Sequence, residues 1–303
     1  MGECTVSANG FDFHVLEEGS GDRLALCLHG FPELGHSWRH QLPVLSDLGY
    51  RVWAPDLRGY GATRPRPTRR RDYLTSSLVD DVAAIIDASE ASEVVLIGHD
   101  WGAALAWQFA VEQVRPLDRL VIMNVPHPAR FFRQLRTLRQ LRKSWYIFVF
   151  QLPWLPEWML GRNDAEAVGK AFTDMAVHPE RFDDDAIRPF RRAASEPGAL
   201  RAMINWYRAI PFGMRDARRS DVPTIETPTL MLWGEQDTAL GKELAVGTDE
   251  FVDDLTLRFL PDASHWVQQD QPDVVNAMLT AFLRGDAVPE HDTIRTPVGP
   301  NVE

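Results

Sequence analysis

The sequence Gly98-His99-Asp100-Trp101-Gly102 places an acidic side chain between two glycines, at the junction of two sequence patterns. The apolar run before it, residues 94–97, is typical of a buried strand, and the pattern after it is helical. A Gly-x-nucleophile-x-Gly sequence between a strand and a helix is typical of a nucleophile elbow, a turn so sharp that the flanking positions must be glycine. We therefore interpret Asp100 as a nucleophile.

A carboxylate nucleophile predicts displacement chemistry rather than acyl transfer. It attacks carbonyl carbons poorly, but it can attack an electrophilic sp³ carbon and form an ester with the enzyme. The enzyme must then release this ester, which requires a base to activate water and an acid to orient the base. Asp100 therefore predicts cleavage of C–O or C–halogen bonds.

Two later residues fit the roles of acid and base. Asp237 and His265 each follow an apolar strand pattern, and open α/β sheets bind their ligands at the carboxyl ends of strands. The chain order Asp100, Asp237, His265 is the order nucleophile, acid, histidine that such enzymes use. Glu235 competes for the role of acid, but Asp237 lies farther beyond the strand. Asn124 also follows a strand, but an amide cannot supply the charge.

A third group of residues, His29-Gly30-Phe31-Pro32-Glu33, follows the strand pattern 24–28. Gly30 lets the backbone approach a ligand, and the peptide bond before Pro32 can be cis. We expect an oxyanion hole in which the backbone N–H groups of Phe31 and Trp101 face the Asp100 carboxyl, with both side chains lining the substrate site. The alternative is a tight loop under a lid, with His29 structural.

These residues require a scaffold, and the sequence predicts one. Short apolar strands alternate with helical patterns such as 74–86, which indicates a mostly parallel sheet with helices on both faces. An Asn9-Gly10 turn predicts a hairpin at the start. The predicted strands are 5–8, 11–16, 24–28, 51–54, 94–97, 120–123, 229–233 and 255–259.

The strand rhythm stops in the middle of the chain and divides it into parts. Residues 1–128 and 215–285 are the predicted halves of the core, residues 129–214 an inserted all-helical lid, and 286–303 a loose tail. We expect the lid to begin with an amphipathic helix over residues 131–142, whose arginines face outward.

Composition limits the possible partners. The chain has 303 residues and a formal net charge of −11, which argues against a nucleic-acid partner. The basic run 64–71 is expected to be a solvated loop. Cys4 and Cys27 have no neighbours at metal-ligand spacing and predict free thiols in a reducing compartment. The start of the chain has no signal-peptide pattern, and the apolar run 145–150 is too short to cross a bilayer. We expect a cytoplasmic protein without stable membrane insertion, either a monomer or a homodimer.

The quoted sequences, together with Asp56-Leu57-Arg58-Gly59-Tyr60-Gly61, resemble the motif set of soluble epoxide hydrolases with the α/β-hydrolase fold. The resemblance extends to about residue 285. It implies an eight-stranded, mostly parallel sheet with a helical lid (cap), and hydrolysis of a small-molecule epoxide by water without a metal or organic cofactor. It also implies a role in detoxification.

The same resemblance implies a role for two lid tyrosines. Tyr146 and Tyr207 stand in contexts similar to those of the family's two tyrosines, which donate hydrogen bonds to the epoxide oxygen, and Trp206 is expected to contact substrate. Ring opening develops an alkoxide, and a tyrosine with a pKa of about 10 stays protonated and can donate to it.

Two alternatives remain at this point. Haloalkane dehalogenases share the Asp nucleophile and would use Trp101 as one halide donor, with a lid tryptophan such as Trp206 as the second, since Phe31 has no side-chain donor. Fluoroacetate-type dehalogenases are disfavoured because no arginine follows Asp100 closely. A catalytically silent hydrolase fold that serves as a binding protein is the second alternative.

Overall fold

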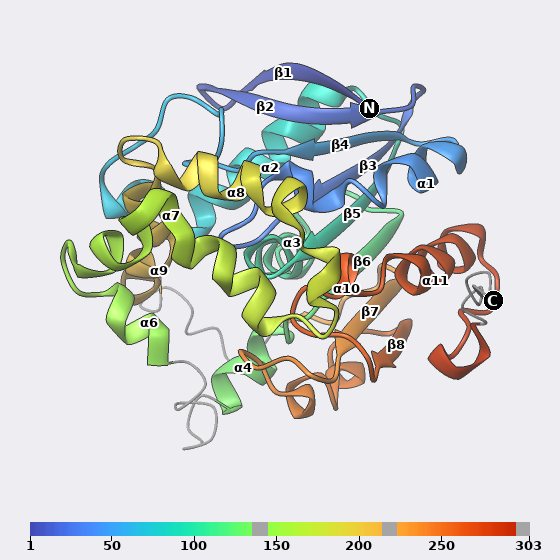
Figure 1. The fold of residues 1–303 in the computed structure, drawn as a ribbon. Helices are drawn as coiled ribbons and strands as arrows, with labels where there is room; N and C mark the ends of the chain where they lie inside the picture. Colours follow the sequence, from blue (N-terminus) through green and yellow to red (C-terminus); the bar gives the residue numbers. More distant parts are fainter. Residues whose placement is uncertain (135–144, 214–222, 295–303) are drawn as a thin grey trace, which may run out of the picture.

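The computed structural model describes residues 1–134, 145–213 and 223–294. In these residues eight strands form one sheet in the order β1-β2-β4-β3-β5-β6-β7-β8 (Figure 1). β1 and β2 pair as the antiparallel hairpin expected from the sequence, and Asn9 and Gly10 both have positive φ in its turn. β2 and β4 are also antiparallel, and all later pairs are parallel. The strands are β1 (Gly2–Ala8), β2 (Phe11–Glu18), β3 (Arg23–Leu28), β4 (Arg51–Pro55), β5 (Glu93–His99), β6 (Arg119–Met123), β7 (Thr229–Gly234) and β8 (Leu255–Leu260).

The sheet separates two apolar layers, because successive side chains of a strand point to opposite faces. Leu26 and Leu96 pack in one cluster, and their neighbours Cys27 and Ile97 pack in the other. The first cluster contains the apolar faces of α2 (Thr75–Ser89) and α3 (Trp101–Val111), and the second those of α1 (Leu42–Asp47) and α11 (Pro272–Arg284). The predicted sheet with helices on both faces is thus confirmed.

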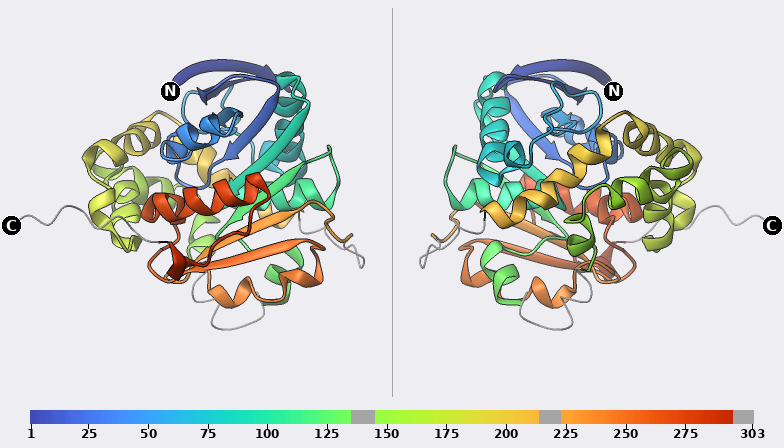
Figure 2. Two further views of the ribbon diagram at one scale, coloured as in Figure 1. Left: turned by 90° about the vertical axis from the view of Figure 1, so that its right-hand side faces the viewer. Right: turned by 90° about the vertical axis from the view of Figure 1, so that its left-hand side faces the viewer.

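Between β6 and β7, the described residues form helices and no strand of the sheet. They gather beyond one end of the sheet, as the two side views show (Figure 2). The helix over Leu155–Met175 is interrupted at residues 162–165. The part of the predicted 131–142 helix from residue 135 onward lies outside the described residues. These helices are α4 (Pro128–Gln134), α6 (Trp145–Phe150), α7 (Leu155–Met175), α8 (Asp184–Ser195) and α9 (Ala199–Gly213).

Short helices and loops complete the chain. After β8 come α10 (Val267–Asp270) and α11, and none of the described helices is long and apolar enough to cross a membrane. Single turns of 3-10 helix occupy Gly35–Trp38, Arg70–Tyr73, Pro179–Arg181, Lys242–Leu244, Thr248–Glu250 and His291–Thr293.

Two segments that the sequence predicts to be loose make contacts with the rest of the chain. In the basic run 64–71, Arg64 and Arg66 both pair with Glu196 of the helical insertion, at 2.9 Å, so part of this loop fastens the insertion to the core. In the segment expected to be a loose tail, Val288 is buried and its carbonyl accepts a hydrogen bond from Arg258 at 2.8 Å. The last residues, 295–303, lie outside the described part.

Candidate active site

Asp100 sits in a sharp turn between β5 and α3. Its φ of 49° and ψ of −120° are unusual for a residue with a side chain, as the elbow pattern predicts. A Cβ added at Gly98 would overlap the backbone of Gly102, and a Cβ added at Gly102 would overlap the Leu28 carbonyl. The two glycines are therefore required by the close approach of α3 to the strands.

The loop after β3 holds one oxygen of the Asp100 carboxyl. The backbone N–H of Phe31 donates to Oδ1 of Asp100 at 2.8 Å. A Cβ at Gly30 would overlap the Asp100 side chain, so only glycine permits this contact. The Phe31-Pro32 peptide bond is cis. Among the described residues, Asp100 receives no hydrogen bond from the N–H of Trp101, whose part in the oxyanion hole stays a prediction.

His265 lies between the two predicted carboxylates. Its Nδ1 is 2.7 Å from Oδ2 of Asp237, and its Nε2 is 3.5 Å from Oδ2 of Asp100. The Asp100 side chain is 15% exposed, whereas Asp237 is fully buried. The N–H groups of Ala239 and Leu240 donate to Oδ1 of Asp237 at 2.7 and 2.8 Å, which fixes its orientation. The three residues predicted from their order in the chain thus come together.

The charges of Asp100, Asp237 and His265 stabilise one another. Burial opposes ionisation of Asp100, but hydrogen bonding to His265 and its charge hold the pKa of Asp100 below its usual value. The pKa of Asp237 is lowered against burial by the same histidine. Burial would lower the pKa of His265, but the two carboxylates raise it well above its usual value. These directions favour an imidazolium between two carboxylates in the unreacted site.

Glu235 and Asn124, the two other candidates for the role of acid, have other hydrogen-bond or ion-pair partners. Glu235 forms an ion pair with Lys242 and does not contact His265. Asn124 supports the acid instead of replacing it: its Nδ2 donates to Oδ2 of Asp237 at 2.8 Å, and its Oδ1 accepts from the N–H of Gly234 at 3.1 Å. The sequence did not indicate these contacts of Asn124.

A buried pair behind the site was also missed. Nδ1 of His99 lies 2.7 Å from Oε2 of Glu33, and its Nε2–H donates to the carbonyl of His265 at 2.7 Å. Glu33 also accepts from the N–H of Gly30 at 2.9 Å. Together these bonds join the Phe31 loop, the elbow and the histidine loop. The only signal in the sequence is that both residues are charged or polar directly beside buried strands.

The two lid tyrosines meet above the elbow. The Tyr207 ring packs edge-on against Trp101 and Phe31, with centroids 5.1 and 5.2 Å apart, and against Tyr146 at 5.9 Å. Burial raises the pKa of both tyrosines, and the negative charge of Asp100 raises it further. Both hydroxyls are therefore protonated at neutral pH and able to donate.

Trp206 lies deeper than expected for a residue that contacts substrate. It is 1% exposed, its ring touches Trp101, and its Nε1–H donates to the carbonyl of Arg58 at 3.0 Å. A halide site would need the indole N–H of Trp206 as a donor, but this N–H is already bonded to the Arg58 carbonyl. His29 is likewise structural, since its ring nitrogens bond the backbone of Gly30 and Leu57.

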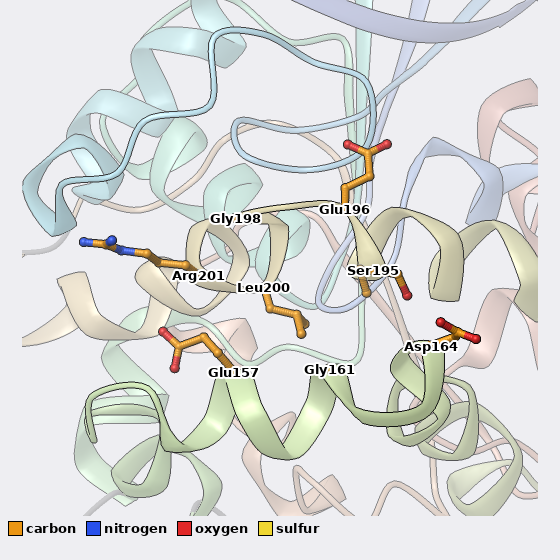
Figure 3. A pocket seen from close by; sticks show the side chains of 9 residues that line it. Glu157, Gly161, Asp164, Ser195, Glu196, Gly198, Leu200 and Arg201 are labelled. Carbon is orange, nitrogen blue, oxygen red and sulfur yellow. The ribbon is translucent and has the colours of Figure 1, made fainter.

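A surface pocket of about 310 Å³ lies between α7, α8 and the start of α9, away from these residues (Figure 3). Glu157 and Arg201 stand at one end of it, and Asp164 and Ser195 at the other. None of the predicted site residues lines it. In the described part of the chain, no three or more His, Cys, Asp or Glu side chains form a group that could hold a metal ion.

Comparison with known proteins shows the family of the chain. The family described as alpha/beta hydrolase fold matches residues 26–272. Epoxide hydrolase 4 of Homo sapiens is 40% identical over 286 residues, which cover 92% of this chain and 77% of that protein. The chain belongs to the epoxide hydrolases of the α/β-hydrolase family. The AB hydrolase superfamily protein YfhM of Bacillus subtilis (strain 168) is 36% identical over 286 residues. The match covers 92% of this chain and 96% of that protein.

Solved structures agree as well. The crystal structure of Bacillus megaterium epoxide hydrolase in complex with an inhibitor matches with a TM-score of 0.85 and 30% identity, over 93% of this chain and 100% of that one. A mutant of an epoxide hydrolase from the same organism, complexed with its diol product, matches with a TM-score of 0.83. The predicted family and fold class are confirmed.

Proposed function

We propose that the protein converts an epoxide and water into a vicinal diol through an ester formed on Asp100. The observation that carries the proposal is the placement of Asp100, with Oδ1 held by the N–H of Phe31 and Oδ2 facing His265. The carboxylate is ionised, as a nucleophile must be, because its pKa is lowered. No metal or organic cofactor is needed.

In the first step Oδ2 of Asp100 attacks an oxirane carbon, and the C–O bond to the ring oxygen breaks. The hydroxyls of Tyr146 and Tyr207 donate to that oxygen as negative charge develops on it. One of the two tyrosines then transfers its proton, so that the oxygen becomes a hydroxyl group of the ester and a tyrosinate remains. Hydrogen-bond donors that face developing charge in a largely dry site are an effective means of stabilising a transition state. The aromatic side chains of Phe31 and Trp101 flank the substrate, with Trp206 supporting Trp101 from behind.

Formation of the ester changes the role of the histidine. The Asp100 carboxylate loses its negative charge, so one of the two charges that raise the pKa of His265 disappears. His265 can then lose its proton, which returns through solvent to the tyrosinate, and act as the base, while Asp237 keeps its orientation. It deprotonates a water molecule, which attacks the ester carbonyl, and the oxyanion forms at Oδ1 beside the N–H of Phe31. The bond between the Asp100 carbonyl carbon and the alkyl oxygen then breaks, and the leaving oxygen takes the proton of the new carboxyl group. This releases the diol and restores the carboxylate, with His265 protonated by the water as at the start.

The test is turnover of a panel of terminal, aryl and internal epoxides, with the diols and their stereochemistry determined by chromatography. We expect diol from the wild-type protein and none from Asp100→Ala. Release of halide from haloalkanes without diol formation would indicate the dehalogenase alternative, which the engaged Nε1 of Trp206 disfavours. An intact, folded protein that converts neither class of substrate would indicate a silent hydrolase fold.

The cellular location and the physiological role are proposals as well. A cytoplasmic location and a role in detoxification are proposed on the basis of the sequence and the resemblance. Small-molecule epoxides and water are the proposed reaction partners.

A further inference from the structure

Arg208, the residue after Tyr207 on α9, is buried although its side chain is charged. It is 4% exposed, and the carboxylate that it pairs with, Glu157 of α7, is 21% exposed. Its Nε–H donates to the carbonyl of Phe150 at 2.8 Å, and one terminal nitrogen donates both to the carbonyl of Leu152 and to Glu157. The other terminal nitrogen donates to the second carboxylate oxygen. A buried charge is tolerated when it is paired and hydrogen-bonded, and both conditions hold here.

The carbonyls that Arg208 holds lie at the end of α6 and just beyond it. Phe150 is the last residue of this helix, whose final carbonyls have no partner within the helix, and a positive charge there is favourable. Gln151 makes the reverse connection, since its Nε2 donates to the carbonyl of Tyr207 at 2.9 Å. α6 has six residues, and a helix so short is not stable on its own. Its position therefore depends on contacts such as these, which join it to α7 and α9 (Figure 1).

The end of α6 that Arg208 holds is one helical turn from Tyr146. Residues four apart lie on the same face of a helix, and the rings of Tyr146 and Phe150 are in contact, with centroids 5.8 Å apart. Both rings also pack against the Tyr207 ring, at 5.9 and 4.9 Å. A helix rises about 1.5 Å per residue, so Tyr146 lies about 6 Å along the axis from the end that Arg208 holds. A tilt of α6 at Phe150 would therefore move the Tyr146 hydroxyl relative to that of Tyr207.

Tyr207 is attached to the core by contacts that do not involve Arg208. The two residues before it on α9, Asn205 and Trp206, donate hydrogen bonds to backbone carbonyls of the core at 3.2 and 3.0 Å. Loss of the Arg208 contacts should therefore displace Tyr146 and leave Tyr207 in place.

We propose that Arg208 is a positioning residue for ring opening, which holds α6 so that the Tyr146 hydroxyl meets the epoxide oxygen beside that of Tyr207. This role rests on the proposed function, because it concerns the step in which both hydroxyls donate to the ring oxygen. It involves no contact between Arg208 and substrate. A purely structural arginine would affect both steps of the reaction alike. A positioning arginine affects formation of the ester and leaves its hydrolysis, which takes place at Asp100 and His265, unchanged.

The test measures the two steps separately at saturating concentrations of an aryl epoxide. The turnover rate and the fraction of enzyme found as ester on quenching, determined by mass spectrometry of the intact protein, together give the rates of ester formation and hydrolysis. The variant is Arg208→Met/Glu157→Gln, which removes the guanidinium without leaving its carboxylate partner charged. We expect ester formation on Asp100 to slow by about 10–100-fold, since misplacement of a reacting group by about 1 Å can cost about 10²-fold. Hydrolysis of the ester should keep the wild-type rate. Equal slowing of both steps would overturn the proposal.

A double-mutant cycle identifies the residue through which Arg208 acts. In the Tyr146→Phe background, the substitution of Arg208 and Glu157 should slow ester formation little further, because the hydroxyl that Arg208 positions is already missing. In the Tyr207→Phe background it should keep its full effect. A full additional loss in the Tyr146→Phe background would show that Arg208 does not act through Tyr146, and would overturn the proposal.

Arg191→Met is the matched control. Arg191 of α8 also donates to two backbone carbonyls of the insertion, those of Asn163 and Asp164, at 3.3 and 3.2 Å. Neither α7 nor α8 carries a tyrosine of the candidate site, so this variant should keep the wild-type rates of both steps. A loss of ester formation in Arg191→Met equal to that in the Arg208 variant would contradict a specific role for Arg208.

A milder variant covers the case in which the double substitution does not fold. Gln151→Met removes the reverse bond to α9 without changing any charge, and it should slow ester formation several-fold while hydrolysis of the ester stays unchanged. In that case, folded Gln151→Met protein with an unchanged rate of ester formation would overturn the proposal. Wild-type protein that forms no ester on Asp100 would overturn the proposed function itself, whereas the other contrary results overturn the role of Arg208 alone.

Discussion

Nε2 of His265 lies 3.5 Å from Oδ2 of Asp100, farther than the 2.7 Å that separates its Nδ1 from Asp237. Charge-assisted N–H···O bonds measure about 2.7–2.9 Å, so His265 is held firmly by Asp237 and only loosely by Asp100. This asymmetry suits the proposed mechanism, in which His265 keeps Asp237 as its partner and exchanges Asp100 for water.

The first prediction separates the two proposed steps. His265→Gln should still allow Asp100 to attack an epoxide, but the ester should persist because no base activates water. Mass spectrometry of the intact protein should show an adduct with the mass of the epoxide, located on the peptide that contains Asp100. Asp100→Ala should show none. An unmodified His265→Gln protein, after incubation with an epoxide that the wild type converts, would contradict the two-step scheme.

The second prediction concerns the lid hydroxyls. Tyr207→Phe and Tyr146→Phe should each lower kcat/KM for epoxides by about 10²–10³-fold, since removal of one such donor costs about 3 kcal/mol of transition-state stabilisation. Tyr73→Phe is the matched control, because its hydroxyl donates to the Pro67 carbonyl outside the site. Steady-state kinetics that show equal losses for all three variants would remove the specific role of the lid tyrosines.

The third prediction concerns Trp206. Trp206→Phe removes the bond to the Arg58 carbonyl, so urea denaturation should show a loss of about 1–3 kcal/mol of stability, because a buried carbonyl is left without its donor. Diol formation should continue in the folded variant. Halide release by the wild type that disappears in this variant would instead make Trp206 a halide donor.

The core and the meeting of the candidate site residues could be predicted because they depend on local signals. The glycines around Asp100 mark a turn that tolerates no Cβ, and Asp237 and His265 lie directly after apolar strands. The support for these residues could not be predicted in the same way. Glu33 meets His99 across 66 residues, and Asn124 meets Asp237 across 113. Such pairs depend on how loops pack at the end of the sheet.

The lid shows the same limit. Composition predicts an inserted helical segment, but it does not predict that Trp206 turns its indole N–H towards the core while its neighbour Tyr207 faces Trp101. Likewise, the sequence predicts a solvated loop for the basic run 64–71. The bonds of Arg64 and Arg66 to Glu196 could not be predicted, because they depend on where α8 ends.

The fourth prediction concerns pH and stability. A hydrogen bond to Asp56 is the largest of the effects that raise the pKa of His14 from 6.5 to about 9. Because the folded state binds this proton more tightly than the unfolded state, the stabilisation is complete below about pH 6.5 and is lost as pH rises through about 9. His14→Asn should therefore cost roughly 1–2 kcal/mol at pH 6 and less at pH 9.5, a range reduced for partial solvent exposure.

Urea denaturation of both proteins at several pH values measures this difference. His291→Asn, which removes a histidine from a terminal turn of 3-10 helix, is the control and should change stability little. A difference between His14→Asn and the wild type that is the same at pH 6 and pH 9.5 would show that the ion pair with Asp56 does not stabilise the fold.

The central claim is that Asp100 becomes esterified in every turnover, and a single turnover in heavy-oxygen water tests it most directly. With enzyme in excess over epoxide, the attacking water should leave its ¹⁸O in the carboxyl of Asp100, and the diol of that first turnover should carry ordinary oxygen. Mass spectrometry of the Asp100 peptide and of the diol gives both values. Label found entirely in the diol, with none at Asp100, would show direct hydration of the epoxide and contradict the ester mechanism.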